Sequence, residues 1–439
     1  MQSRCTTWKL NAKRLRPAWR TTSRSWAMRE HSIGIPTEAD WPEIPLRDLC
    51  HLVSRGTAPT YVENSPVLAI GQRCIQNSGF DASNARPHDR RYKRVLWAAP
   101  GDVLLNSTGT GTIGRSCIFD KSNMFMVDSH VTVIRVDRTK AEPRWINALL
   151  RSRWGQRHLE SHCYTGSTNQ IELSRSELTW MSVPVPPYME QRRIAEILDT
   201  LDSQISVTSR IIDKLQARAH GLIEDLLAST AAEKTPLGIH LTQPPKNGFS
   251  PKEVDEWTGL QAIGLGCLTP DGFQPRQLKN VPARDGRNKS ALLNDGDLLM
   301  SRANTRDLVG LVGIYHDVGS PCIYPDLMMR LTPVETCRTA YLELLLRSNN
   351  SRRQIQGLAQ GTSESMVKVS GASVRQLRLA IPALFEQDRI LSIVDTVRLE
   401  IDAQKRERNG LIRLKDGLAE DLLTGRVRVS EAEAILENL

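Results

Sequence analysis

The sequence predicts a mixed α/β protein in which two repeated globular blocks are joined by long helices packed as an antiparallel coiled coil. Three observations predict this fold class: the chain contains an internal repeat, each copy ends in a long helical pattern, and positive charge gathers between those patterns. We expect the blocks at 45–187 and 230–383, and the helices at 188–229 and 384–426.

The internal repeat has a constant offset of 195 or 196 residues. Pro-Gly-Asp-Val-Leu-Leu at 100–105 matches Asp-Gly-Asp-Leu-Leu-Met at 295–300. Val-Pro-Pro-Tyr-Met-Glu-Gln-Arg-Arg-Ile at 185–194 matches Ile-Pro-Ala-Leu-Phe-Glu-Gln-Asp-Arg-Ile at 381–390. A fixed offset over such a distance indicates one structural unit, a globular block followed by a helix, that is used twice.

Each repeat ends in a heptad pattern, because apolar residues recur in alternating steps of four and three. The first pattern is interrupted only by Thr208, and the second by Gln404, Arg408 and Lys415. A helix with an apolar stripe needs a partner, so we expect the two helices to pack together. Two independent helices, each covering its own block, are the alternative. The expected helix seam consists of Ile194, Leu198, Leu201, Ile205, Ile212, Leu215, Leu222 and Leu226, with Ile390, Val394, Val397, Ile401, Leu411, Leu418 and Leu422.

The globular blocks have the pattern of mixed α/β structure, with short β-rich runs between turn residues and a helical stretch late in each block. The expected strands include Val103–Leu105, Val131–Val136, Leu298–Met300 and Leu311–Tyr315, and the expected helices are Pro143–Leu159 and Thr339–Leu358.

The net charge of +9 is unevenly distributed. Block 45–187 has 18 basic and 12 acidic side chains, and block 230–383 has 18 and 14. The helical segments have net charges of −2 over 188–229 and −3 over 384–439. Positive blocks joined by negative helices favour binding to nucleic acid over a scaffold without a DNA role.

Residues 1–44 are expected to form a basic N-terminal arm, with seven Lys or Arg and no acid in 1–27. The arm could contact nucleic acid, or it could be translated sequence upstream of a start at Met28. Because the tryptophans at 8, 19 and 26 follow no period, the second interpretation is slightly favoured. Residues 427–439 are expected to form a C-terminal tail.

Cysteine spacing indicates reduced thiols in a cytoplasmic protein, because none of the eight cysteines forms a Cys-x-x-Cys pair. His158, His162 and Cys163 lie close together, but no second ligand cluster accompanies them, so we expect no metal site. The chain has no run of about 18 apolar residues and no secretory leader pattern, so no membrane association is expected.

Gly109–Gly114 fits the Gly-x-Gly-x-x-Gly pattern of dinucleotide or S-adenosylmethionine loops. Such a loop needs a following helix, whereas 115–119 has the pattern of a strand, and the repeat copy at 302–313 lacks the glycines. We therefore expect no cofactor and no catalytic residue. A methyltransferase that uses this loop remains the alternative function.

The loops contain the residue types that read DNA: Arg for guanine, Asn and Gln for adenine, Ser and Thr for phosphate or base. These side chains follow the Gly-Asp turns, precede the long helices, or form basic clusters in each copy. The candidate DNA-binding residues are Arg90, Arg91, Lys93, Asn106, Thr108, Thr110, Arg115, Thr168, Asn169 and Gln170 in the first copy, and Arg287, Lys289, Ser301, Arg302, Asn304, Arg306, Ser363 and Lys368 in the second.

The Gly-Asp-[Val/Leu]-Leu turn and the Pro…Glu-Gln-x-x-Ile helix start, each present twice, resemble the specificity subunits of Type I restriction–modification systems. The resemblance covers about 44–426. Copy two departs from the pattern at Ala383, where copy one has Pro187.

This resemblance implies that the blocks are target-recognition domains, each of which reads half of a bipartite double-stranded DNA sequence. It implies that the helices set the unread spacer and dock two methyltransferase subunits, which contain the active sites. A motor–endonuclease subunit can be a further partner.

Overall fold

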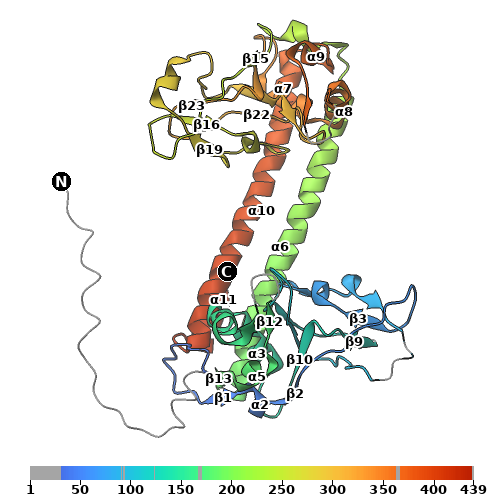
Figure 1. The fold of residues 1–439 in the computed structure, drawn as a ribbon, viewed down its shortest axis with the longest axis vertical. Coiled ribbons are helices and arrows are strands. Elements are labelled where there is room, and N and C mark those ends of the chain that lie inside the picture. The colour runs from blue at the N-terminus through green and yellow to red at the C-terminus, as the bar shows by residue number, and fades with distance from the viewer. Residues whose placement is uncertain are drawn as a thin grey trace, which may run out of the picture. The chain divides into compact units, whose positions relative to one another are not determined.

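A computed structural model describes residues 31–437, apart from residues 90, 92–93, 123, 167–170 and 362–365 (Figure 1). The chain divides into two compact units. Unit 1 combines the chain up to Thr208 with the segment from Glu407 onward, and unit 2 is Ser209–Arg406. Each unit therefore contains one globular block and parts of both long helices.

Unit 1 is built on a four-stranded antiparallel sheet in the order β2-β10-β7-β8. A second sheet has the order β6-β3-β9, in which β3 and β9 are parallel. All four side chains of β7 are buried, because this strand lies inside the larger sheet. The strands of the two sheets are β2 (Cys50–Arg55), β3 (Leu68–Ile70), β6 (Arg86–Pro87), β7 (Val103–Asn106), β8 (Ser116–Ile118), β9 (Phe125–Val127) and β10 (Val131–Val136).

Smaller elements complete the globular part of unit 1. Phe80, Phe119 and Phe125 pack edge to face between the sheets and a hairpin, with ring centroids 5.0–5.6 Å apart. These elements are β1 (Glu43–Pro45) paired with β13 (Ser182–Pro184), the hairpin of β4 (Ile75–Gln76) and β5 (Gly79–Phe80), β11 (Tyr164–Thr165) paired with β12 (Glu172–Leu173), and helices α2 (Leu46–Leu49) and α5 (Arg175–Trp180).

Unit 2 has sheets with the same strand order and the same pairing directions. Its four-stranded antiparallel sheet is β15-β24-β20-β22, and its three-stranded sheet is β19-β16-β23, with β16 and β23 parallel. The elements are β14 (Lys234–Pro236), β15 (Lys246–Asn247), β16 (Gln261–Ile263), β17 (Leu268–Thr269), β18 (Gly272–Phe273), β19 (Leu278–Asn280), β20 (Leu298–Ser301), β21 (Ala303–Asn304), β22 (Val312–Ile314), β23 (Cys322–Ile323), β24 (Met328–Leu331), β25 (Val367–Lys368), β26 (Arg378–Ala380) and helix α9 (Gly371–Arg375).

The helical stretch late in each block is two helices, not the single helix expected. The break falls at Ser152 in unit 1 and at Ser348 in unit 2, where the backbone is extended. Each serine hydroxyl accepts a bond from the backbone N–H three residues later, at 3.0 Å for Ser152 and 3.3 Å for Ser348. Such an N-cap starts a new helix. The helices are α3 (Pro143–Arg151), α4 (Arg153–His158), α7 (Thr339–Arg347) and α8 (Asn349–Leu358). A short π-helix, Leu159–Cys163, follows α4 and begins at the last residue of the expected stretch.

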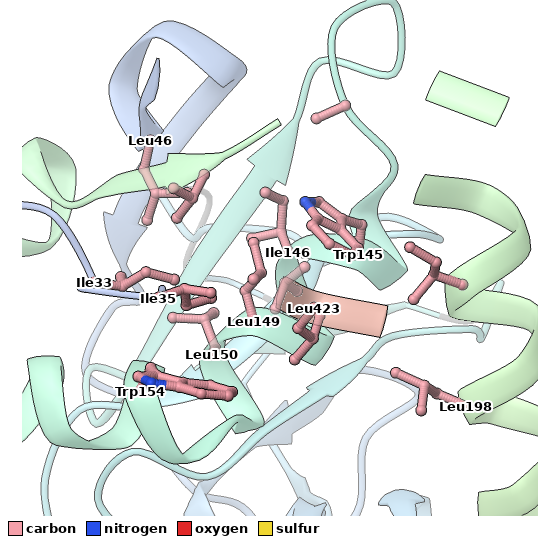
Figure 2. Close-up of a cluster of buried hydrophobic side chains, with 14 of the residues drawn as sticks. Ile33, Ile35, Leu46, Trp145, Ile146, Leu149, Leu150, Trp154, Leu198 and Leu423 are labelled. Atoms are coloured by element: carbon pink, nitrogen blue, oxygen red, sulfur yellow. The ribbon is translucent and has the colours of Figure 1, made fainter. Parts of the chain in front are cut away.

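The two long helices are α6 (Tyr188–Ala228) and α10 (Leu384–Thr424). Within unit 1, the start of α6 shares a core with the end of α10; Figure 2 shows Leu198 and Leu423 in this core beside Trp145. Within unit 2, the end of α6 shares a core with the start of α10. In both units the start of one long helix therefore packs with the end of the other.

The expected helix seam is displaced at the end of α6. Leu222 is 39% exposed, whereas Ile223 and Leu227 pack in the core of unit 2 together with the expected seam residue Leu226. A straight α-helix drifts by about 20° per heptad relative to a strict seven-residue repeat. Over the four heptads from Ile194 the drift approaches the 100° that separates neighbouring residues, so the buried stripe moves forward by one position.

Both chain ends that the structure describes pack against unit 1, which corrects two expectations. Ile33 and Ile35 of the expected arm are buried in its core, whereas residues 1–30 lie outside the described part. The expected C-terminal tail contains helix α11 (Val429–Glu437), with Ala432 fully buried. Arg193 of α6 forms an ion pair with Glu433 of α11.

A buried glutamine from the Glu-Gln motif holds each block to its long helix. The Gln191 amide accepts a bond from the Glu142 backbone N–H at 2.9 Å and donates to the Pro186 carbonyl at 2.7 Å. Gln387 makes the same bonds with the Arg338 N–H at 2.8 Å and the Pro382 carbonyl at 2.7 Å. Sequence analysis identified the motif but not this role.

Substituting Gln191→Ala should destabilise unit 1 by about 1–3 kcal/mol, because a buried N–H and a buried carbonyl lose their partners. Thermal denaturation measures the loss as a lower Tm. Gln216→Ala, at an exposed position of the same helix, is the matched control. Equal Tm values for the two variants would contradict the proposed role of the buried amide.

Candidate nucleic-acid interface

In unit 1, polar side chains gather where β7 ends and β10 begins. The Thr108 hydroxyl lies 2.8 Å from Nδ1 of His130 and also accepts a bond from the Gln72 amide. A β-bridge joins Thr108 to Glu172, whose carboxylate lies 3.0 Å from the Arg55 guanidinium. These loops form an open cleft lined by Thr108, Gly109, Thr110, His130, Thr165, Gly166, Ile171 and Glu172.

The glycine loop at this cleft is a turn between two strands. Gly109, Gly111 and Gly114 have φ values of 97°, 77° and 82°, a region that favours glycine. The loop leads directly into strand β8, and no helix N-terminus follows to face a phosphate. This geometry agrees with the strand expected after the loop and removes the structural basis for the methyltransferase alternative.

Two expected DNA contacts are corrected by their burial. The Asn106 side chain is fully buried, and its amide nitrogen donates to the Gln72 and Thr112 carbonyls, both at 3.2 Å. Ser301 is also buried; its hydroxyl donates to the Leu308 carbonyl at 3.0 Å. Both side chains hold the loop in shape and cannot reach a base edge.

In unit 2, the loop after β20 displays basic and amide groups. Arg302 is half-buried, and Asn304 accepts a bond from the Thr305 N–H at 2.9 Å. The Arg306 guanidinium donates to the Gln356 carbonyl at 3.3 Å. Lys368 is exposed in β25, where it pairs with Ala303 of β21. The structure thus brings four of the expected residues to one strand–loop cluster.

Equivalent positions of the two clusters have different side chains. The Thr108–Glu172 bridge of unit 1 corresponds to the Ala303–Lys368 pair of unit 2 at the repeat offset of 195 to 196 residues. A hydroxyl and a carboxylate are therefore replaced by a methyl group and an ammonium group. The two units present different chemistry on the same arrangement of strands.

The remaining expected residues lie elsewhere or outside the described part. Arg91 is exposed and binds the Asp89 carboxylate, lowering the pKa of Asp89 to about 2. Arg115 donates to the Gly111 carbonyl at 2.7 Å, and Arg287 and Lys289 are exposed at the end of a 3₁₀ turn. The expected residues outside the described part are Arg90, Lys93, Thr168, Asn169, Gln170 and Ser363.

Sequence analysis missed an exposed aromatic in the loop between β2 and β3. The ring of Tyr61 is 3.6 Å from the Arg86 guanidinium carbon, and its hydroxyl donates to Asp128 at 3.1 Å. Burial and the Asp128 carboxylate raise the pKa of Tyr61. In unit 2, Trp257 of the loop between β15 and β16 is 61% exposed.

The aspartate of each repeated Gly-Asp turn has a structural role. Asp102 lies 2.7 Å from Nη2 of Arg135, and Asp297 lies 2.7 Å from Nη1 of Arg330. Hydrogen bonding to Asp102 raises the pKa of Arg135. The turn is therefore anchored to the central strands β10 and β24, which positions the loops that follow β7 and β20.

The histidines near the end of α4 have structural partners. The His158 and His162 rings stack at 4.6 Å, and His158 Nδ1 lies 3.0 Å from the Ser32 carbonyl. Burial lowers the pKa of His158 to about 4, so the ring is neutral near pH 7. The His158 side chain is also buried. The described residues contain no cluster of three or more His, Cys, Asp or Glu that could hold a metal ion.

Comparison with known proteins agrees with the family resemblance in the sequence. Residues 38–217 match the family model for the Type I restriction modification DNA specificity domain. The chain is 22% identical to the Type I restriction enzyme EcoKI specificity subunit of Escherichia coli (strain K12), over 84% of each chain. It is 22% identical to the putative type I restriction enzyme MjaX specificity subunit of Methanocaldococcus jannaschii, over 89% of this chain and 94% of that one.

A solved structure from work on complex assembly and conformational transition of the type I R-M system has the same fold. It covers 89% of this chain and 99% of its own, with 17% identity and a TM-score of 0.58. None of the described helices is both long and apolar enough to cross a membrane.

These observations define a DNA-specificity domain: the family model covers the block of unit 1 and most of α6, and the relatives extend the likeness into unit 2. Residues 38–217 thus form a Type I restriction modification DNA specificity domain, and the chain over most of its length is similar to the specificity subunits of Type I restriction–modification systems.

Proposed function

We propose that the two blocks are repeated target-recognition domains, each of which reads one half of a bipartite DNA sequence. The observation that carries this proposal is the pair of equivalent strand–loop clusters with different side chains, Thr108 and Glu172 against Ala303 and Lys368. A reader of two different half-sites needs a common framework with different hydrogen-bonding groups on it.

Charge supports binding of the blocks to the DNA backbone. Block 45–187 has six more basic than acidic side chains, and block 230–383 has four more. Phosphate contacts supply affinity without sequence information, and base contacts supply the specificity. We assign the exposed Arg91, Arg287 and Lys289 to the first class, and the residues at the strand–loop clusters to the second.

The long helices form the spacer and docking part of the proposal. Packed as an antiparallel coiled coil, α6 and α10 would set the unread distance between the half-sites and bind two methyltransferase subunits. A helix of 41 residues is about 60 Å long. Methylation, and cleavage where a motor–endonuclease subunit joins, would then reside in the partners. The isolated chain should accordingly show no binding of S-adenosylmethionine in calorimetry.

Substituting Arg302→Ala should test base reading in unit 2. If this guanidinium contacts a base edge, the variant should lose about 1–3 kcal/mol of DNA-binding free energy and relax the sequence requirement at one position of one half-site. Fluorescence anisotropy on the complex with its methyltransferase partner measures the affinity, and sequencing of methylated DNA gives the motif. Arg413→Ala, at an exposed position of α10, is the control. An unchanged motif and affinity would contradict the assignment.

A further inference from the structure

In unit 1, the block contacts its helix through basic side chains that face acidic ones. Nη1 of Arg144 on α3 lies 3.3 Å from the Asp199 carboxylate of α6. Nη1 of Arg151, also on α3, lies 3.1 Å from the Asp202 carboxylate, to which Lys415 of α10 also binds. Asp202 therefore joins the block, its own helix and the returning helix.

In unit 2, the same contact has a different charge pattern. At the repeat offset of 196, Arg151 corresponds to Arg347, but Asp202 corresponds to Arg398. Arg347 donates to the Pro270 carbonyl at 3.0 Å and lies 4.0 Å from the Asp271 carboxylate of its own block. Arg398 pairs with Asp395 of its own helix at 3.7 Å. Burial lowers the pKa of Arg347, and the charge of Arg398 lowers it further. Two cations thus occupy the place that an ion pair occupies in unit 1.

The charges are also reversed where each long helix begins. The residue before α3 is Glu142, and its equivalent before α7 is Arg338. The Arg338 guanidinium binds both carboxylate oxygens of Asp388 on α10, at 2.9 and 3.0 Å. The position on α6 that corresponds to Asp388 is Arg192. Between the units, the charge of the block residue and the charge of the helix residue are therefore both reversed.

We infer that these charges assign each recognition block to its own helix, and so fix the order of the two half-sites along the DNA. Exchanging the blocks would place Glu142 against Asp388 and Arg338 against Arg192. The position shared by Arg151 and Arg347 is an arginine in both blocks, so it does not distinguish the two orders. Like charges in direct contact oppose association and select against the wrong arrangement. The link to half-site order rests on the proposed function, whereas the charge pairing does not depend on it.

Point variants test the pairing without DNA. Arg398→Asp should raise the Tm by about 2 °C, because Arg347 exchanges a like charge on α10 for a second carboxylate partner beside Asp271, and Asp202→Arg should lower it by about 4 °C. Arg406→Asp and Asp213→Arg make the same charge changes at exposed helix positions and are the controls. Adding Arg151→Asp to Asp202→Arg should restore part of the loss. Asp388→Arg should lower the Tm below that of the Asp213→Arg control, because Arg338 then faces a like charge instead of its carboxylate partner. Equal Tm values for these two variants would overturn the inference.

A full-length chain with blocks 45–187 and 230–383 exchanged tests the assignment. We expect it to have a lower Tm than the natural chain, and we expect Arg192→Asp and Asp388→Arg together to restore that Tm. The rescued chain, with its methyltransferase partner, should methylate the two half-sites in reversed order. An exchanged chain as stable as the natural one would overturn the inference. Rescue of the Tm with no methylated motif would contradict the proposed DNA-reading function and leave the charge pairing intact.

Discussion

Replacing residues 45–187 with the corresponding block of a relative is expected to change one half of the methylated DNA target and to leave the other half unchanged. Unit 1 and unit 2 have separate sheets and separate cores, and each supplies its own strand–loop cluster. The reading groups of one unit therefore do not depend on the other. Each mismatched base pair costs about 1–3 kcal/mol, so a change of several bases should redirect the enzyme completely to the new target.

Methylation motifs read by sequencing from cells that express the hybrid with its methyltransferase partner measure this result. The reciprocal hybrid, with residues 230–383 replaced, is the matched control and should change the opposite half. The incoming block should keep Gln191 and the acidic residues of α6 as its partners, because these groups hold α3 in place. A hybrid in which both halves of the motif change, or neither does, would rule out two independent readers.

The helices and central strands could be predicted from the sequence because their signals are local and occur twice. The Pro…Glu-Gln motif predicts helix starts at 188 and 384, and α6 and α10 begin at these residues. Strand β10 was expected at the bounds it has, Val131–Val136. An apolar run of β-branched residues predicts a buried strand without knowledge of its neighbours.

The residues that hold loops could not be separated from those that line a surface. Asn106 and Ser301 have the same side-chain types as DNA-reading residues, but both are buried with backbone partners. Their burial depends on how β7 and β20 lie within their sheets, and a single sequence does not give sheet order. The pairing of Asp102 with Arg135, 33 residues away, was missed for the same reason.

The helix breaks at Ser152 and Ser348 could have been predicted from the sequence, although the apolar periodicity continues across them. A serine three residues before the N–H that it caps is a helix start, and it occurs at both positions of the repeat. The shift of the buried face of α6 to Ile223 could also have been predicted, because it follows from the 3.6-residue period of a straight helix over four heptads.

Inserting four residues into α6 near Ser206 is expected to lengthen the unread spacer of the DNA target by one or two base pairs. The insertion adds about 6 Å of helix, and base pairs are about 3.4 Å apart along the duplex. Four residues are a little more than one helical turn, so the apolar stripe turns locally but both sheets keep their own cores. Each recognition block should therefore fold and should still read its own half-site.

The division between the units falls at Thr208 in α6 and at Arg406 in α10. A second variant therefore has insertions at both of these places. Four residues inserted in both helices, near Ser206 and after Arg406, lengthen both helices equally and should give the new spacing with higher activity than the single insertion. Four residues inserted near Ala232, beyond the end of α6, are the control and should leave the spacing unchanged. Sequencing of methylated DNA reports all three results. Full activity at the original spacing from the double insertion would show that the helices do not set the distance, because a longer pair of helices would then hold the two half-sites no farther apart.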